Sequence, residues 1–272
     1  MDLTSTKTIK ELFLRHDSRP SKIMGQNFLI NRPALKKIIE TAQLTHEDTV
    51  LEVGPGIGNL TELLAQKAGK VIAIEKDRIM IEILKETTKN YNNVEVRHKD
   101  ILKFPISNTQ FPNYKVVANL PYYITSPLIR KFLEEKNQPD VMVLMVQKEV
   151  AQRICSRPPD MSLLSVSVQF YAKAKIISYV SRECFWPRPK VDSAIIKISN
   201  IKNQKSKIFV EKFFKVVRAG FSHPRKQLAN NLSNVLGKDK NQIHQWLSKN
   251  NIDPKQRAET LSIENWINLT NS

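Results

Sequence analysis

Glycine is scarce in this chain, which contains only seven glycines among its 272 residues. Three of the seven stand at positions 54, 56 and 58. Glycine adopts left-handed backbone conformations without strain, and it lets a ligand approach the main chain closely. The concentration of so scarce a residue in one short stretch therefore indicates a turn whose backbone has a functional role.

Cysteines, metal-ligand clusters and long apolar runs are also lacking. Cys155 and Cys184 are the two cysteines, and neither belongs to a C-x-x-C pair or a Cys/His cluster with zinc spacing. The five histidines show no ligand spacing, so we expect no metal. No apolar run reaches the roughly 18 residues of a transmembrane helix, and residues 1–20 lack the apolar stretch of about 7–15 residues found in secretory signals. We therefore expect a cytoplasmic protein with no membrane partner.

Acidic residues are few relative to basic ones. The chain has 26 Asp+Glu against 43 Lys+Arg, a formal net charge of +17. Such an excess is typical of proteins that bind polyanions, and nucleic acid is a better candidate here than a membrane interior. A lysine-rich coding bias that favours solubility explains the charge about as well. The 41% hydrophobic and 25% charged residues exclude a wholly disordered, collagen-like or coiled-coil chain.

Short apolar strands alternate with helical segments over most of the chain. Strands are predicted at 49–53, 71–74, 94–96, 114–118, 141–146 and 195–198, and helices at 59–68, 79–84 and 127–133. This alternation predicts a mostly parallel sheet that binds its ligand at the carboxyl ends of the strands. Residues 200–207 are polar and basic, and helix and loop patterns follow. We place domains at 1–200 and 201–272; the second holds 13 Lys+Arg against 5 Asp+Glu.

Acidic residues accompany the glycine turn at the ends of three predicted strands. The G-x-G-x-G spacing differs from the G-x-G-x-x-G of nicotinamide-binding folds, because position 59 is Asn. Glu75 ends the second strand, where a carboxylate accepts both hydroxyls of a ribose. Asp100 follows the third strand, where it can accept from an adenine amino group. A tight turn with two solvated acids explains the loop alone equally well. The ordered set resembles class I methyltransferases, which bind S-adenosylmethionine.

The tetrapeptide Asn119-Leu-Pro-Tyr122 follows the fourth predicted strand. An adenine amino nitrogen is a poor nucleophile, because its lone pair is delocalised into the ring. The Asn119 oxygen and a backbone carbonyl beside Pro121 can accept from both N6 protons, and Tyr122 can stack on an extruded base. An ordinary Asn-x-Pro turn with a packed tyrosine is the alternative. The motif resembles those of adenine amino-methyltransferases, and Leu at position 120 resembles their RNA-directed branch.

Four further strings resemble one family. They are Gly25-Gln-Asn-Phe-Leu29, Gln147-Lys-Glu-Val-Ala151 with Arg153, Phe185-Trp-Pro-Arg-Pro-Lys-Val-Asp-Ser193 and Arg225-Lys-Gln-Leu-Ala-Asn-Asn-Leu232. Together they are similar to the KsgA family of small-subunit ribosomal RNA adenine N6-dimethyltransferases, over residues 21–269. The resemblance implies a class I S-adenosylmethionine-dependent methyltransferase fold, Rossmann-like with a mostly parallel seven-stranded sheet, followed by a small all-α C-terminal domain.

The resemblance also implies an activity and its residues. The activity is transfer of four methyl groups to N6 of two adjacent adenosines near the 3′ end of small-subunit rRNA, late in assembly, by a monomer acting on a pre-assembled particle. S-adenosylmethionine would contact Asn27, Leu29, Gly54, Gly56, Glu75, Asp100, Ile101 and Asn119. The target base would contact Asn119, Tyr122 and Phe185. The RNA-binding residues would be Arg218, Arg225 and Lys226. Met161-Ser162 replaces a Tyr-Gly pair frequent in relatives.

Two other functions remain open on the sequence alone. A large-subunit rRNA adenine methyltransferase of the antibiotic-resistance type shares the glycine loop and the Asn-x-Pro-Tyr motif. The proline-rich string at 185–193 and the string at 225–232 favour the small-subunit enzyme. A non-catalytic assembly or transcription factor on the same fold is the second alternative, and the intact Asn119, Tyr122, Glu75 and Asp100 argue against it.

Overall fold

The structure is a computed structural model that describes residues 1–21, 23–106, 113–201 and 206–272. The chain forms two compact units, Met1–Ala151 with Lys173–Ile201 and Gln152–Ala172 with Lys202–Ser272. The contacts therefore divide the chain near the predicted boundary at 200, but they also group residues 152–172 with the C-terminal part. Positions 202–205 of the polar stretch at 200–207 lie outside the described residues.

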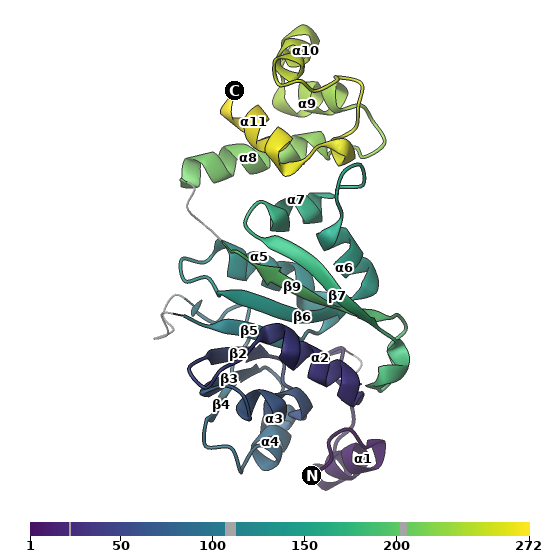
Figure 1. Cartoon of the computed structure of the whole chain (residues 1–272). Helices are drawn as coiled ribbons and strands as arrows, with labels where there is room; N and C mark the ends of the chain where they lie inside the picture. Colours follow the sequence, from purple (N-terminus) through teal and green to yellow (C-terminus); the bar gives the residue numbers. More distant parts are fainter. Residues whose placement is uncertain (22, 107–112, 202–205) are drawn as a thin grey trace. The chain divides into compact units, whose positions relative to one another are not determined.

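A seven-stranded sheet forms the centre of the first unit, in the strand order β4-β3-β2-β5-β6-β9-β7 (Figure 1). The strands are β2 (Thr49–Val53), β3 (Lys70–Glu75), β4 (Val94–His98), β5 (Lys115–Asn119), β6 (Val141–Gln147), β7 (Lys173–Val180) and β9 (Ser193–Ser199). The first five in this order pair in parallel, and β9 runs antiparallel to both β6 and β7. The prediction of an α/β fold with a mostly parallel sheet is confirmed.

Helices pack against the sheet through apolar faces. They are α2 (Arg32–Ala42), α3 (Asn59–Ala65), α4 (Arg78–Thr87) and α5 (Thr125–Glu134). Leu35 and Ile38 of α2 are buried in one core cluster with Val143 and Met145 of β6. The start of α2 is fixed locally, because the Asn31 side chain accepts from the Ala34 amide at 2.9 Å. This packing fixes the strands whose carboxyl ends form the site.

The N-terminal helix α1 (Thr6–Arg15) supports the loop that carries Phe28. The Phe13 ring lies 5.6 Å from the Phe28 ring and 6.2 Å from the Trp186 ring, between centroids. Phe28 and Trp186 face each other in a two-stranded antiparallel sheet of β1 (Phe28–Leu29) and β8 (Phe185–Trp186). Two sequence strings far apart in the chain are thereby held side by side.

The second unit is helical, as predicted for the C-terminal part. It contains α7 (Leu163–Gln169), α8 (Lys207–Gly220), α9 (Leu228–Leu236), α10 (Lys240–Lys249) and α11 (Ile263–Asn271). Trp266 of α11 packs so closely on α8 that a Cβ at Gly220 would lie 2.4 Å from its ring. The Phe170 and Phe213 rings stack with centroids 4.0 Å apart. Among the described residues, no helix has both the length and the apolar character to cross a membrane.

Candidate functional site

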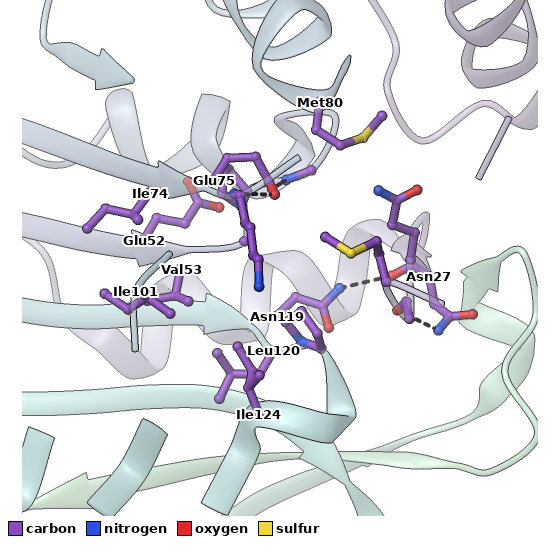
Figure 2. Close-up of a pocket in the computed structure, with 18 of the residues that line it drawn as sticks. Asn27, Glu52, Val53, Ile74, Glu75, Met80, Ile101, Asn119, Leu120 and Ile124 are labelled. Atoms are coloured by element: carbon purple, nitrogen blue, oxygen red, sulfur yellow. Dashed lines mark hydrogen bonds between the residues drawn. The ribbon is translucent and has the colours of Figure 1, made fainter. Parts of the chain in front are cut away.

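A pocket lies at the carboxyl ends of β2, β3 and β5 in the first unit (Figure 2). This is the edge at which parallel α/β sheets bind ligands. Nine of the predicted site residues line it: Asn27, Gly54, Gly56, Glu75, Asp100, Ile101, Asn119, Tyr122 and Phe185. Leu29 is buried in the core instead, where its carbonyl accepts from the Asn59 side chain. The pocket thus brings together side chains spread over about 160 positions of the sequence.

The glycine turn needs glycine for its backbone conformation. Gly54, Gly56 and Gly58 have φ angles of +64°, +57° and +93°, all in the left-handed region. At Gly56 a Cβ would also come within 3.0 Å of the Phe28 ring. Gly58 is the N-cap of α3, so the helix begins directly after the turn. A helix N-terminus beside an open backbone favours a negatively charged ligand group such as a carboxylate.

Glu75 is held by backbone donors at the end of β3. Its Oε1 accepts from the amides of Lys76 at 2.7 Å and Asp77 at 2.9 Å, and its Oε2 accepts from the Gly56 amide at 3.2 Å. Burial raises the pKa of this carboxyl, and the three backbone hydrogen bonds only partly oppose the rise. The carboxyl group is therefore fixed in orientation and ties the glycine turn to the neighbouring strand.

Asp100 forms an ion pair that the sequence did not reveal. Lys76 Nζ lies 3.0 Å from Asp100 Oδ2, and the Leu102 amide donates to Oδ1 at 3.0 Å. The hydrogen bond from Lys76 is the main reason why the pKa of Asp100 is lowered. Lys76 follows Glu75 directly and lines the same pocket, so the acceptor predicted for an adenine amino group already carries a cationic donor.

Glu52 is a second lining residue without a predicted role. It is the fourth residue of β2 and is 1% exposed, and no other residue that the structure describes forms a hydrogen bond with its Oε2. Burial raises the pKa of Glu52 to about 8; the nearby Thr61 hydroxyl opposes the rise and the Glu75 carboxylate adds to it. A buried polar atom without a partner is costly. The atom therefore marks a position where the pocket can bind a polar or cationic ligand group.

Asn119 is oriented by the loop that precedes β1. Its Nδ2 donates to the Asn27 carbonyl at 3.2 Å, and Asn27 Nδ2 donates to the Gly25 carbonyl at 3.0 Å (Figure 2). An amide whose nitrogen is engaged by a carbonyl presents its oxygen as the acceptor. The segment Gly25 to Leu29 therefore contacts the tetrapeptide at 119–122 through a hydrogen bond. This bond engages the nitrogen of the Asn119 amide and leaves its oxygen to face the pocket.

Tyr122 and Phe185 line the same pocket as this acceptor. The Tyr122 hydroxyl is 2.8 Å from Ser193 Oγ, and burial raises the pKa of Tyr122 despite that hydrogen bond. Phe185 is 4% exposed, pairs with Leu29 in the two-stranded sheet, and belongs to the core cluster as well as to the pocket lining. Both rings line the same pocket as Asn119, and Tyr122 is fixed by a hydrogen bond while Phe185 is fixed by packing.

The three predicted RNA contacts belong to the second unit. Arg218 lies in the last turn of α8, and Arg225 and Lys226 lie in the loop before α9; all three are exposed. The buried Asn231 joins that loop to α8, because its Nδ2 donates to the carbonyls of Gly220 at 2.7 Å and His223 at 2.9 Å. The string at 225–232 thus combines exposed cations with the amide that holds their loop.

The lining residues suit an adenosine-containing ligand with an amino-acid end. Glu75 and Asp100 offer carboxylates for hydroxyl and amino groups, and the glycine turn leaves backbone amides for a carboxylate. Apolar side chains for a purine ring are also present: Phe28, Met80, Ile101 and Leu102. Together with the unpartnered Glu52 oxygen, this set of donors and acceptors fits S-adenosylmethionine. Among the described residues no cluster of three or more His, Cys, Asp or Glu side chains has metal-binding geometry.

Comparison of the sequence with known families gives one match over almost the whole chain. A family model described as "Ribosomal RNA adenine dimethylase" matches residues 18–272. The chain is 46% identical over 266 residues to a ribosomal RNA small subunit methyltransferase A from Dehalococcoides mccartyi, covering 96% of this chain and 90% of that protein. It is 42% identical to the protein of the same name from Clostridium botulinum, with 96% of each covered.

Two solved structures are similar to this one over most of the chain. A dimethyladenosine transferase from Plasmodium falciparum has a TM-score of 0.73 and 31% identity, and the match covers 88% of this chain and 94% of that one. The 23S rRNA methyltransferase ErmE also has a TM-score of 0.73, with 26% identity and coverage of 90% and 98%. Both support the class I methyltransferase fold, and the prediction of that fold is confirmed.

Proposed function

The chain belongs to the ribosomal RNA adenine dimethylase family, and from this premise we propose that it methylates N6 of adenosines in small-subunit ribosomal RNA, using S-adenosylmethionine. The products are N6,N6-dimethyladenosines. The observation that carries the proposal is the Asn119 side-chain oxygen, which is oriented as an acceptor in a pocket suited to an adenosine-containing methyl donor. The substrates are two adjacent adenosines near the 3′ end of the RNA, within a pre-assembled particle in the cytoplasm.

The methyl donor would be held by residues at three strand ends. Glu75 would accept from its ribose, Asp100 and Ile101 would contact its adenine, and Gly54 and Gly56 would contact its amino-acid end beside Asn27. S-adenosylmethionine supplies a sulfonium-activated methyl group. Binding at Asp100 requires Lys76 to share or release its 3.0 Å contact with that carboxylate. The pocket residues thus hold the donor, and the neighbouring tetrapeptide presents the acceptor base.

The tetrapeptide activates the target amino group by accepting its protons. In the first transfer, Asn119 Oδ1 and the Leu120 carbonyl accept one N6 proton each, which favours a pyramidal nitrogen and directs its lone pair at the methyl group. In the second transfer the monomethylated nitrogen has one proton left, and one of these two acceptors binds it. Leu120 is anchored because its amide donates to the Met145 carbonyl at 3.1 Å. Tyr122 stacks on one face of the extruded base and Phe185 borders the other. After transfer, the nitrogen releases a proton to solvent; no strong base is needed.

The small subunit is favoured over the large subunit as the source of the substrate. The two relatives described above that are named for the small subunit are 46% and 42% identical to the chain, whereas the structurally similar 23S enzyme is 26% identical. Mass spectrometry of rRNA tests the proposal: purified protein and S-adenosylmethionine should produce N6,N6-dimethyladenosine in undermethylated small subunits. Dimethylation of large-subunit RNA alone, or of neither RNA, would contradict it.

Neutralising two exposed cations in the second unit should weaken binding of the particle without affecting the pocket. In Arg225→Gln/Lys226→Gln, two candidate phosphate contacts are lost, so affinity should fall and the slope of log affinity against log salt should flatten by about 1–2. Binding of undermethylated small subunits at several salt concentrations measures both. Lys207→Gln/Lys212→Gln, which removes two exposed charges from α8, is the matched control. An unchanged slope would mean that Arg225 and Lys226 are only solvated.

A further inference from the structure

An exposed aromatic ring with a cation beside it lies at the edge of the sheet that carries the target-base residues. Tyr179, near the end of edge strand β7, is 54% exposed, and Lys148 Nζ lies 5.3 Å from the centroid of its ring. Neither residue lines the pocket described above. We propose that Lys148, Tyr179 and Arg182 form a platform that binds an unpaired RNA nucleotide flanking the target adenosine. This inference rests on the proposed function and deepens it.

Strand register places the platform at the same end of the sheet as the residue that holds Tyr122. Ser193 of β9 pairs with Gln147 of β6 on one side and with Val180 of β7 on the other, and its hydroxyl is the partner of the Tyr122 hydroxyl. Lys148 directly follows Gln147, and Tyr179 directly precedes Val180. Tyr179 itself pairs with Ala194, so it lies at the same end of the sheet as Ser193 but is offset from it by one residue. Because successive side chains of a strand point to opposite faces, its ring lies on the face opposite to the Ser193 hydroxyl.

Asp192 connects the same elements through hydrogen bonds. Its carbonyl accepts from the Lys148 amide at 3.0 Å, and its Oδ1 accepts from the Arg182 amide at 3.1 Å. Asp192 is adjacent to Ser193, so one dipeptide positions Tyr122 on one side and the platform cations on the other. Arg182 also donates from its guanidinium to the Lys190 carbonyl at 3.2 Å, which holds its side chain along this edge. The platform is therefore built on the same scaffold as the target-base residues.

The chemistry of the platform fits a nucleotide. An exposed aromatic ring stacks on a base of any sequence, and lysine and arginine bind the adjoining phosphates. Lys190 is exposed nearby, and Val191 is 43% exposed, which gives further cationic and apolar surface. Two acidic residues also lie there: Glu149 follows Lys148, and Glu183 pairs with Arg188 at 2.9 Å. Enzymes that modify a base act on single-stranded nucleic acid or extrude the target nucleotide, so an unpaired base lies beside the target wherever the target stretch is single-stranded.

Substitution of the ring tests stacking separately from folding. We expect Tyr179→Ala to raise the Kd and KM for undermethylated small subunits about tenfold, with kcat at saturation and the Kd for S-adenosylmethionine within twofold of wild type. Tyr179→Phe keeps the stacking ring and should remain within twofold in every measurement. Lys148→Gln should flatten the salt slope of binding by about 1. Lys36→Gln, on the exposed face of α2, removes one charge elsewhere and should leave the slope unchanged.

The nature of the partner is tested by crosslinking. A photoreactive phenylalanine analogue introduced at position 179 should crosslink to rRNA close to the methylated adenosines. Crosslinks only to a ribosomal protein, or a Tyr179→Ala variant that binds particles as wild type does, would overturn the platform while leaving the methyltransferase function intact. Wild-type protein that binds particles through Tyr179 but does not methylate them would overturn the function and leave the platform standing.

Discussion

Replacing Asn119 by alanine is expected to lower kcat for N6 methylation by about 10²–10³-fold, the range found when one preorganised polar group is removed from an active site. The Kd for S-adenosylmethionine should change by less than about threefold, because the strand-end carboxylates and the glycine turn remain. Alanine removes the oxygen that accepts from N6 and also the Nδ2 that donates to the Asn27 carbonyl at 3.2 Å. Single-turnover methylation and calorimetric titration measure the two effects.

Two further variants separate the oxygen from its orientation. Asn119→Asp keeps an acceptor but loses the donor to Asn27, so its kcat should lie between those of wild type and Asn119→Ala. Asn27→Ala leaves Asn119 intact and removes only the Asn27 side chain, whose Nδ2 donates to the Gly25 carbonyl at 3.0 Å. Its loss of kcat should be smaller than that of Asn119→Ala. A kcat for Asn119→Ala within threefold of wild type would refute the role of the oxygen.

The strand ends were predictable from the sequence because each carries its own local signal. Buried parallel strands such as β3 and β5 consist of apolar runs, and the polar residue at the end of each run, Glu75 or Asn119, falls at the same edge of the sheet. Asp100 follows β4, whose residues alternate between apolar and charged and are only partly buried. The strand β7 was not predicted. It is an edge strand with exposed Lys173, Lys175 and Tyr179 and a bulge between Ile176 and Ser178, so neither an apolar run nor a clean alternation marks it.

The interactions between side chains could not be predicted from the sequence. The sequence around Lys76 and Asp100 does not indicate that these two residues form an ion pair. Nor does the sequence around Asn119 indicate whether the nitrogen or the oxygen of its amide is hydrogen-bonded. These contacts depend on rotamers that only the packed structure fixes. The same holds for Glu52, which reads as an ordinary strand residue until the sheet and α3 bury it. Residue types and strand ends can therefore be predicted, whereas protonation states and hydrogen-bond partners cannot.

Glu52 makes the stability of the first unit sensitive to pH. Its pKa rises from an ordinary 4.5 to about 8 in the folded chain, so the folded state holds a proton that the unfolded state has released. Stability from this group is fully present below pH 4.5 and is lost as the pH rises toward 8. Glu52→Gln, which is neutral at every pH, should therefore unfold with a weaker pH dependence than wild type. At about 1.4 kcal/mol per pKa unit, the variant should gain about 2–4 kcal/mol relative to wild type between pH 5 and pH 8.5.

Other carboxyls also titrate in this range. Their contribution cancels when the free energy of unfolding of Glu52→Gln is subtracted from that of wild type at each pH. Burial raises the pKa of Glu75 as well, but that residue is present in both wild type and Glu52→Gln. Urea unfolding followed by hydrogen exchange of the β2 and β3 amides reports the first unit, so unfolding of the helical unit does not enter the comparison. Parallel stability curves for the two proteins from pH 5 to 8.5 would show that Glu52 is ionised when folded. Such ionisation would require a partner for its Oε2, because an unpaired carboxylate buried at 1% exposure is the costlier state.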